Sequence, residues 1–341
     1  MRIVTYNVEW FNSLFDDAGR LIDDHTFSGR QDVRRDTQIA GLGVVFQALD
    51  ADAVMVIEAP DENRRRHTVP ALEGFAARFG LRAREALIGF PNATQQEIAL
   101  LYDPDALSAR HDPQGDPTGK KGTADAPRFD GVFRLDLDVD GTPDLVRWSK
   151  PPLEVALTTR KGRVLRLIGV HAKSKAPRGG GNAEEEMRDA IDNRRKQLAQ
   201  CIWLRLRIDQ HLAAGEDLIV LGDLNDGPGL DAYEKLFGRS GLEVLLGEDG
   251  GPRLYDPHAR LLMGGKTAAQ PASARFRIPP DGHFLQAMLD YILVSPSLAA
   301  LKPVWRIWHP FDDAACYADA RLRNGLLAAS DHFPVSLDID I

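Results

Sequence analysis

The chain has 341 residues, of which 43% are hydrophobic, so it can bury a sizeable core and could form one large domain or two ordinary ones. Its formal net charge of −8 argues against a protein that coats nucleic acid through a globally basic surface, although a local basic patch remains compatible with that charge. The sequence has no run of about 18 apolar residues, as a membrane helix requires, and its first residues, MRIVTYNVEW, lack the features of a secretory signal. We therefore expect a cytoplasmic protein with no membrane partner.

Short apolar runs that stop at a polar residue recur along the chain and predict buried strands. Strands are expected at 2–8, 52–58, 98–102, 132–139, 153–159, 164–171, 218–223, 287–294 and 333–339, with a helix at about 34–49 after the first strand. The clearest helix runs from about 183 to 213 and keeps apolar residues along one side from Met187 to Leu212, so it should lie across a sheet. Stretches rich in glycine, proline or aspartate predict loops at 111–131, 176–182 and 247–282.

The organisation of the chain favours a single domain over residues 1–341. We find no internal repeat, no low-complexity tract and no change of composition that would mark a linker. Strands outnumber helices, which is typical of sheet-on-sheet packing with helices outside. The two cysteines, Cys201 and Cys316, are too few for a disulfide framework or a zinc cluster, and we expect both to be packing residues.

The polar residues that end the predicted strands are the first indication of chemistry. They are Asn7, Glu58, His171, Asp223 and Asp290. A carboxylate buried at a strand end is costly unless it is paired, hydrogen-bonded or bound to a metal. Several such ends converging on one rim therefore suggest a metal site.

Six segments, in this order, resemble the endonuclease/exonuclease/phosphatase superfamily, which includes deoxyribonuclease-like hydrolases. They are T-Y-N-V-E at 5–9, I-E at 57–58, G-V-H at 169–171, G-D-L-N-D at 222–226, L-D-Y-I at 289–292 and S-D-H-F-P-V at 330–335. Any one of them is a weak signal, because G-D-x-N also occurs in turns, but six in the family's order are specific. The resemblance implies an α+β fold, a four-layer α/β/β/α sandwich in which two packed, mostly antiparallel sheets are flanked by helices.

The resemblance also implies a divalent metal site. Glu58 matches the family's main metal-binding carboxylate, and Asn7 and Asp331 match further metal-site residues, while Glu9 is an additional candidate at a position where the family varies. Such a sparse set of oxygen ligands suits Mg²⁺, with Mn²⁺ or Ca²⁺ as alternatives. Taken alone, Glu58 would more often be a solvated carboxylate at a strand end.

The same resemblance assigns catalytic roles. His332 matches the catalytic histidine and Asp290 the carboxylate that orients it, whereas Asp223 and Asn225 match the pair beside the attacking water and the phosphate. Either Asp223 or the His332–Asp290 pair could be the general base. His171 matches a second histidine of deoxyribonuclease-like members that the repair-nuclease branch lacks, although a lone histidine at a strand end is more often structural.

Three lysines are candidate substrate-binding residues. Lys173 and Lys175 follow His171 in a segment that resembles the H-x-K-S-K signature of bacterial nuclease-like members, and their charge suits an anionic transition state. A solvated turn is the alternative. Lys150 stands where the family usually has arginine, and lysine offers a point charge instead of a bidentate fork.

The start of the long helix carries further basic residues, Arg188, Arg194, Arg195 and Lys196, which we expect to form its solvated side more readily than a substrate contact. The glycine run at 179–181 before this helix lacks the Lys-Ser/Thr of a P-loop, and a lid is expected there instead of a nucleotide site.

These observations predict a divalent-metal-dependent phosphodiester hydrolase that works by in-line attack of water, with Asn225 and His171 holding phosphoryl oxygens. A nuclease that acts on DNA or RNA is the first expectation, because two lysines beside a phosphate-handling histidine suit a polyanion. A small-molecule phosphodiesterase or phosphatase is the alternative that the acidic composition favours, and a lipid substrate fits less well because no basic amphipathic helix occurs. A non-catalytic binding module is disfavoured, since every matched catalytic position holds a competent residue.

Overall fold

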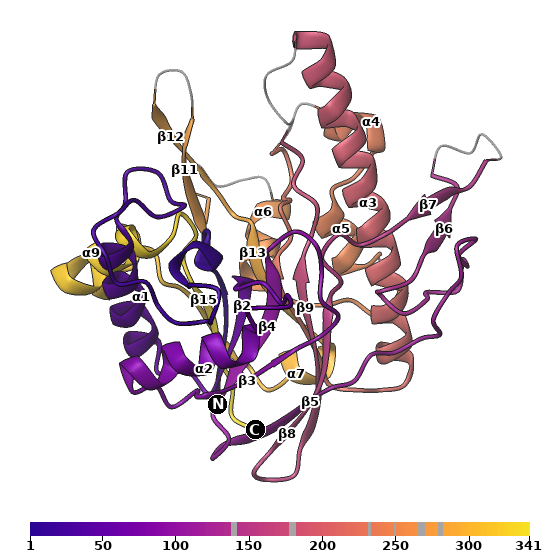
Figure 1. Ribbon diagram of the computed structural model, residues 1–341. Coiled ribbons are helices and arrows are strands. Elements are labelled where there is room, and N and C mark those ends of the chain that lie inside the picture. Colours follow the sequence, from indigo (N-terminus) through magenta and orange to yellow (C-terminus); the bar gives the residue numbers. More distant parts are fainter. Residues whose placement is uncertain (138–141, 177–181, 231–232, 249, 265–269, 279–281) are drawn as a thin grey trace.

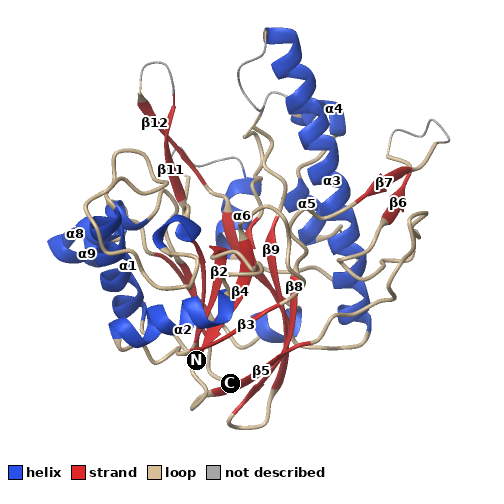
Figure 2. Cartoon of the chain, in the orientation of Figure 1, coloured by secondary structure: helices blue, strands red, loops and turns tan. Residues whose placement is uncertain are grey.

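The computed structural model describes residues 1–341 except 138–141, 177–181, 231–232, 249, 265–269 and 279–281. Two sheets pack face to face at its centre, with helices on both outer faces (Figures 1 and 2). The first sheet has the order β14-β15-β1-β2-β4-β3 and the second β13-β10-β9-β8-β5. Within these sheets β1–β2 and β9–β10 are parallel and the other neighbours are antiparallel. The expected α/β/β/α sandwich is therefore confirmed.

The strands and helices have the following bounds. The first sheet consists of β1 (Arg2–Asn7), β2 (Ala53–Ala59), β3 (Glu85–Ile88), β4 (Glu97–Tyr102), β14 (Val304–Ile307) and β15 (Val335–Asp338). The second consists of β5 (Leu107–His111), β8 (Leu153–Thr159), β9 (Val164–His171), β10 (Leu218–Asp223) and β13 (Asp290–Val294). Outside them lie two hairpins, β6 (Phe133–Leu135) with β7 (Asp144–Val146) and β11 (Ala274–Ile278) with β12 (His283–Ala287).

The helices divide between the two outer faces. The first sheet packs against η1 (Phe11–Leu14), α1 (Arg35–Leu49), α2 (Thr68–Phe79), α8 (Ala314–Ala318) and α9 (Ala320–Ala329). The second packs against α3 (Ala183–Ala213), α4 (Glu234–Phe237), α5 (Gly241–Leu246) and α6 (Pro257–Gly264), while α7 (Pro296–Ala299) joins the core between the sheets.

Strand β2 illustrates how the sequence produces these layers. Its side chains alternate between faces, so Val54 and Val56 pack under the helices while Met55 and Ile57 pack against the second sheet. Because both faces are covered, an uninterrupted apolar run is what such a strand requires. The run ends where the strand reaches the edge of the sheet.

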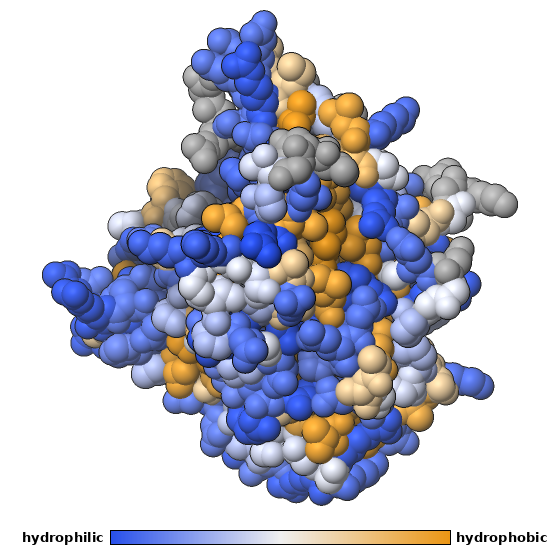
Figure 3. All heavy atoms as spheres, turned by 90° about the vertical axis from the view of Figure 1, so that its right-hand side faces the viewer, coloured by the Kyte–Doolittle hydropathy of each residue, from blue (hydrophilic) through white to orange (hydrophobic). Residues whose placement is uncertain are grey.

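Helix α3 begins with a capping box in which Asn182 and Glu185 satisfy each other's backbone N–H groups. Its buried side starts only at Asn193, and Met187 is 43% exposed. The apolar side expected from Met187 onward is therefore wrong for the first turns, which extend beyond the sheet (Figure 1). Figure 3 views the side of the molecule on which α3 lies, where a band of hydrophobic atoms is bordered by hydrophilic ones.

Some expected element bounds differ from the structure. The loop expected at 247–282 is wrong in part, since it contains α6 and β11. The strand expected at 287–294 is divided, because Ala287 ends β12 and β13 begins at Asp290. The strand expected at 132–139 is shorter as β6, and its last two residues, like the glycine run at 179–181, lie outside the described residues.

Candidate active site

Sheet topology places the polar strand ends at one edge of the sandwich. Parallel pairing carries β1 and β2 to the same edge, where Asn7 lies opposite Ile57, and does the same for β9 and β10, where His171 lies opposite Asp223. Antiparallel β13 starts at this edge, with Asp290 opposite Asp223. Residues far apart in the sequence therefore meet here.

A β-bulge directs Glu58 toward this edge. The pairing of β2 with β4 shifts between Ile57 and Ala59, and Glu58 takes the left-handed conformation with φ 63°. This conformation is uncommon for a residue with a side chain. The Glu58 carboxylate accepts the backbone N–H of Trp10 at 3.3 Å, and its Oε1 lies 4.0 Å from Nε2 of His171.

Asp223 is the centre of a buried hydrogen-bond network. Its Oδ2 accepts the side-chain amides of Asn7 at 3.0 Å and Asn225 at 3.1 Å, and its Oδ1 accepts the backbone N–H of Asn225 at 2.7 Å. His171 Nε2 lies 3.6 Å from the same Oδ2. The network fixes the Asp223 carboxylate between the two sheets' ends.

His332 and Asp290 form the expected pair. Nδ1 of His332 lies 2.8 Å from Oδ2 of Asp290, and both side chains are buried. The hydroxyl of Ser273 donates to the same Oδ2 at 2.8 Å and accepts the backbone N–H groups of Leu289 and Asp290. The carboxylate is thus held from two sides, which fixes the orientation of the imidazole.

Lys150 lies against the second histidine. Its Nζ is 3.1 Å from Nδ1 and 3.0 Å from Nε2 of His171, and it donates to Oε1 of Gln96 at 2.9 Å. Burial, with the charges of Lys150 and His332, lowers the pKa of His171 well below its usual value. The Lys150 ammonium donates a hydrogen bond to the neutral imidazole, so His171 acts as an acceptor.

The other titratable groups respond to burial and to one another. Burial raises the pKa of Asp223 to about 7, although the positive charge of His332 acts to lower it. Burial lowers the pKa of Lys150 to about 8, although the negative charge of Glu58 acts to raise it. Burial opposes the charge on His332, but Asp290 and Asp223 outweigh it and raise the pKa of His332 well above its usual value. His332 is therefore a cation at neutral pH.

The expected metal residues offer a fitting set of oxygen atoms. Asn7 turns its amide nitrogen to Asp223, and its buried Oδ1 has no hydrogen-bond partner among the described residues. Burial raises the pKa of Glu58, and burial together with Asp331 raises the pKa of Glu9 to about 7. A cation would relieve this crowding of carboxylates, and hard oxygen ligands are what Mg²⁺ prefers.

A different trio, Asp223, Asp290 and His332, has potential ligand atoms within 4.8 Å of one another. In that trio, however, the imidazole Nδ1 and the Asp290 carboxylate are already bonded to each other, and the His332 charge would repel a cation. Asn7, Glu58 and Asp331 therefore stay the predicted cation ligands, whereas Glu9 already pairs with Arg30.

Lys173 and Lys175, the two lysines after His171, line different cavities. Lys175 pairs with Asp226, a fully buried carboxylate that also accepts the backbone N–H groups of Gly227 and Gly241. Lys173 lines a groove beside α3. Lys175 thus has a structural contact, and the substrate role of both residues stays a prediction.

The basic residues of α3 do not form one solvated side, as we expected. Arg194 is only 1% exposed and lies 3.9 Å from Asp226, whereas Arg195 pairs with Asp144 of β7 at 2.7 Å. The expectation is wrong for Arg194 because residues of the 222–226 motif and α4 fold over the helix and supply its partners.

Sequence reasoning missed several residues that position the site. Ser330 donates to the carbonyl of Asn7 and accepts the backbone N–H groups of Glu9 and His332, so it ties the end of β1 to the segment before β15. Its place in S-D-H-F-P-V was the only signal. Ser273 and Gln96 lie outside the six segments that resemble the family, and no sequence feature pointed to either residue.

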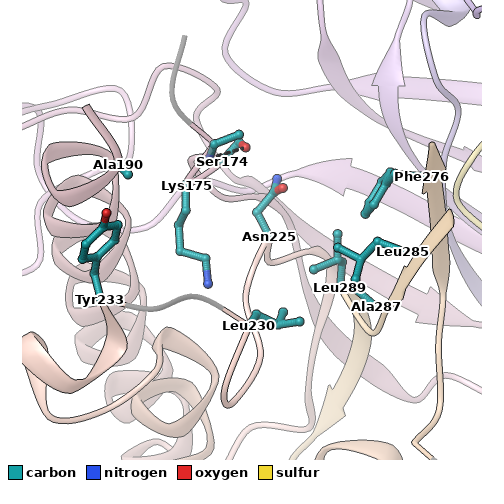
Figure 4. Close-up of a pocket in the computed structure, with 11 residues that line it drawn as sticks. Ser174, Lys175, Ala190, Asn225, Leu230, Tyr233, Phe276, Leu285, Ala287 and Leu289 are labelled. Carbon is teal, nitrogen blue, oxygen red and sulfur yellow. Dashed lines mark hydrogen bonds between the residues drawn. The ribbon is translucent and has the colours of Figure 1, made fainter. Parts of the chain in front are cut away.

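The β11–β12 hairpin forms one wall of a cleft beside the catalytic groups. Ala274 bridges to His332, and the ring of Phe276 packs edge-on against its imidazole with 5.6 Å between centroids. Figure 4 shows the cleft of about 330 Å³, with Asn225 between the α3 side and the apolar side chains of the hairpin. The space next to Asn225 therefore suits an uncharged or aromatic group.

Comparison with known proteins identifies the family. The sequence pattern of the Endonuclease/Exonuclease/phosphatase family matches residues 4–332, so the chain belongs to this family. Its members are hydrolytic nucleases and phosphatases, and the chain is a hydrolase of this class. A search of proteins with curated function gives no match.

Solved structures share the fold at low sequence identity. Truncated TDP2 from Caenorhabditis elegans is 12% identical, with all of this chain and 97% of that chain covered and a TM-score of 0.51. An AP endonuclease from Archaeoglobus fulgidus is 13% identical, with both chains fully covered and a TM-score of 0.50. At such identities the likeness concerns the fold alone. In the described part of the chain, no helix is both long and apolar enough to span a membrane.

Proposed function

We propose that this protein is a divalent-metal-dependent phosphodiesterase, with a nucleic acid as its substrate, and that residues 1–341 act as one catalytic domain. The convergence of Asn7, Asp223 and Asn225 with the His332–Asp290 pair at one edge of the sandwich carries the proposal. The core shared between the two sheets supports the single domain.

Asp223 is the general base in this proposal. Three hydrogen bonds from Asn7 and Asn225 fix its carboxylate, and a pKa raised to about 7 by burial suits proton transfer from water near neutral pH. His332 carries a positive charge, which prevents it from accepting that proton. The directions of these two pKa shifts favour Asp223 over His332 as the general base.

The remaining groups stabilise the phosphoryl oxygens. The His332 imidazolium, held by Asp290, faces the negative charge that develops as water adds in line. Lys150 supplies further positive charge, whereas the amide of Asn225 already donates to Asp223 and to the carbonyl of Ala172 and would have to exchange one of these bonds for a phosphoryl oxygen. Mg²⁺ bound at Asn7, Glu58 and Asp331, with Glu9 nearby, would polarise the phosphate and offset charge on the leaving group.

A nucleic acid is favoured over a small phosphoester because Lys150 contacts His171 and because basic residues, Lys173 among them, line a groove beside α3. The TDP2 and AP endonuclease neighbours carry names of enzymes of this family, and they support only the fold. A small-molecule phosphodiesterase or phosphatase is the second candidate, which the cleft of about 330 Å³ favours.

The test is hydrolysis of bis-(p-nitrophenyl) phosphate, single-stranded oligonucleotides and a phosphomonoester by protein supplied with Mg²⁺, with chelator controls. Asp223→Asn and His332→Ala should each lower kcat by at least about 100-fold, because each removes a group that acts in the transition state. Circular dichroism would verify that both variants fold. Turnover within a few-fold of the parent would overturn the mechanism, and a preference for the monoester would favour the second candidate.

A further inference from the structure

A groove of about 500 Å³ runs between the β6–β7 hairpin and α3. It lies on the side of the molecule seen in Figure 3. Four basic residues line it, namely Arg147 after β7, Lys173 after β9, and Arg195 and Lys196 on α3, whereas its acidic lining residues are Asp144 and Asp192. Among the described residues that line the groove, basic side chains thus outnumber acidic ones, in a chain whose formal net charge is −8.

Two chain segments connect the groove to the candidate active site. Ser149 lines the groove and precedes Lys150, which contacts His171, while Lys173 follows His171 by two residues. Two extended residues span at most about 7 Å. That distance corresponds to about two nucleotides along a stacked strand.

One buried side chain joins the two walls of the groove. Gln200 of α3 accepts the backbone N–H of Lys173 at 3.0 Å and donates to the carbonyl of Arg147 at 3.3 Å. These contacts hold the segments of Arg147 and Lys173 at a fixed separation beside the helix. The spacing of the basic residues is therefore built into the fold, in contrast to that of a cluster on a free loop.

Two of the four basic side chains are available for a ligand. Asp144 lies 2.7 Å from Arg195 and neutralises it. Arg147 and Lys196 are exposed, and within the described ranges neither has an ion-pair partner. Two positive charges beside a phosphate-handling site favour a polyanion.

We propose that this groove binds the phosphodiester chain of a single-stranded nucleic acid as it continues from the scissile phosphate. The inference rests on the proposed function and adds that the substrate is a polymer. A volume of about 500 Å³ is that of a small-ligand pocket, so it admits nucleotides of one strand and not a duplex. Because the described residues of its lining include no aromatic side chain, binding comes from phosphate contacts and is independent of base sequence.

The first experiment measures binding without catalysis. Fluorescence anisotropy of a labelled 12-nucleotide DNA strand, in chelator, compares the parent with the double variant Arg147→Gln/Lys196→Gln. The double variant should bind at least about ten-fold more weakly, and the slope of log K against log salt should decrease in magnitude by about 1.4, or about 0.7 for each lost phosphate contact.

A matched control removes the same charge from the opposite end of the sandwich. Arg160 and Lys302 are exposed, Arg160 in the turn between β8 and β9 and Lys302 before β14. Arg160→Gln/Lys302→Gln should bind like the parent. Equal weakening by both double variants would mean that net charge alone matters, and no weakening by either would exclude the groove; both results overturn the proposal.

The second experiment distinguishes the groove from the reaction. In the parent with Mg²⁺, kcat/KM should rise with oligonucleotide length from 2 to 12 nucleotides, and the groove variant should lose that rise while hydrolysing bis-(p-nitrophenyl) phosphate within about two-fold of the parent. Activity on the small diester without any length dependence would overturn the polymer proposal and leave the phosphodiesterase intact. A parent inactive on both substrates would overturn the proposed function itself. Comparison of single-stranded DNA, single-stranded RNA and a duplex identifies the preferred nucleic acid. A preference for the duplex would overturn the proposal that the groove binds a single strand.

Discussion

The charge on His332 depends on a small number of neighbouring carboxylates. Burial alone would lower the pKa of His332, and Asp290 is the largest of the charges that raise it. The imidazolium loses its proton only when the pH rises through this elevated pKa. The contribution to phosphate binding that we propose for His332 is therefore expected at neutral pH and should be lost on the alkaline side.

Asp290→Asn should move the alkaline limb of the pH–rate profile to lower pH, because the pKa of His332 falls when the Asp290 charge is removed. The acid limb reports deprotonation of Asp223 and should move much less. We also expect kcat to fall about 100-fold. The profile of kcat against pH with bis-(p-nitrophenyl) phosphate measures both effects. An unchanged alkaline limb would show that His332 is not the imidazolium whose deprotonation lowers the rate.

Ser273 is a positioning residue that acts through Asp290. Ser273→Ala removes the hydroxyl that donates to Asp290 and leaves two buried N–H groups without their acceptor, which should lower the free energy of unfolding by about 1–3 kcal/mol. Because the His332–Asp290 pair loosens, kcat should fall about ten-fold with KM nearly unchanged.

Ser295→Ala is the matched control for this variant. Ser295 is also buried and accepts the backbone N–H of Leu218, but it lies at the far end of β13. Ser295→Ala should lower the free energy of unfolding by a comparable amount. At temperatures below its unfolding temperature, it should keep the parent's kcat. If both variants kept the parent's kcat, Ser273 would be a structural residue only.

At the scale of elements, the close approach of β9 and β10 requires a glycine. Gly222 has φ 141°, and a Cβ there would lie 2.0 Å from the carbonyl oxygen of Val170. The glycine of G-D-L-N-D is thus explained by backbone packing and not by chemistry. It allows Asp223 and His171 to end their strands side by side.

Gly222→Ala should separate β10 from β9 and lower the unfolding temperature by at least about 5 °C, since the clash is with backbone and cannot be relieved by a rotamer change. Thermal unfolding followed by circular dichroism gives the value. Gly74→Ala is the comparison, because a Cβ at that position in α2 meets nothing within 4 Å. A Gly222→Ala protein as stable as Gly74→Ala would contradict the packing argument.

The elements that the sequence prediction missed are mainly the short ones. Strands β3, β5, β7 and β14 have three to five residues, and β11 was missed although Ala274, Phe276 and Ile278 alternate with arginines in it. Helix α2 was missed although it packs on the first sheet. By contrast β8, β9, β10 and α3 have the predicted bounds, since long apolar runs and helical spacing are local properties of the sequence.

At the scale of the whole molecule, a crowded carboxylate site couples cation binding to stability. Glu9, Glu58 and Asp331 lie together at one edge of the sandwich, and the unfolded chain would not hold them together. A ligand that binds only the folded state raises the free energy of unfolding, by about 2.7 kcal/mol at 100 times its Kd. The site should therefore be detectable without any substrate.

Mg²⁺ added to chelator-treated protein should raise the unfolding temperature and restore diester hydrolysis. Glu58→Gln should lose most of the thermal shift, because it removes the negative charge of the main proposed ligand. Differential scanning fluorimetry with a titration of Mg²⁺, Mn²⁺ and Ca²⁺ measures this and ranks the ions. An equal shift in Glu58→Gln would show that the cation binds elsewhere, and Asp103→Asn, at the opposite edge, is the control for general loss of charge.

By itself the sequence determined the family and the candidate side chains for the chemistry, because Asn7, Glu58, His171 and Asp223 each end an apolar run and stand in the order of a known family. Only the tertiary structure decided how they meet. His332 contacts Asp290 across 42 residues, and Asn7 contacts Asp223 across 216. Such contacts follow from the order and register of strands, which local propensity does not specify. For the same reason Ser273, Gln96 and the groove beside α3 became visible only once the two sheets and α3 were in place.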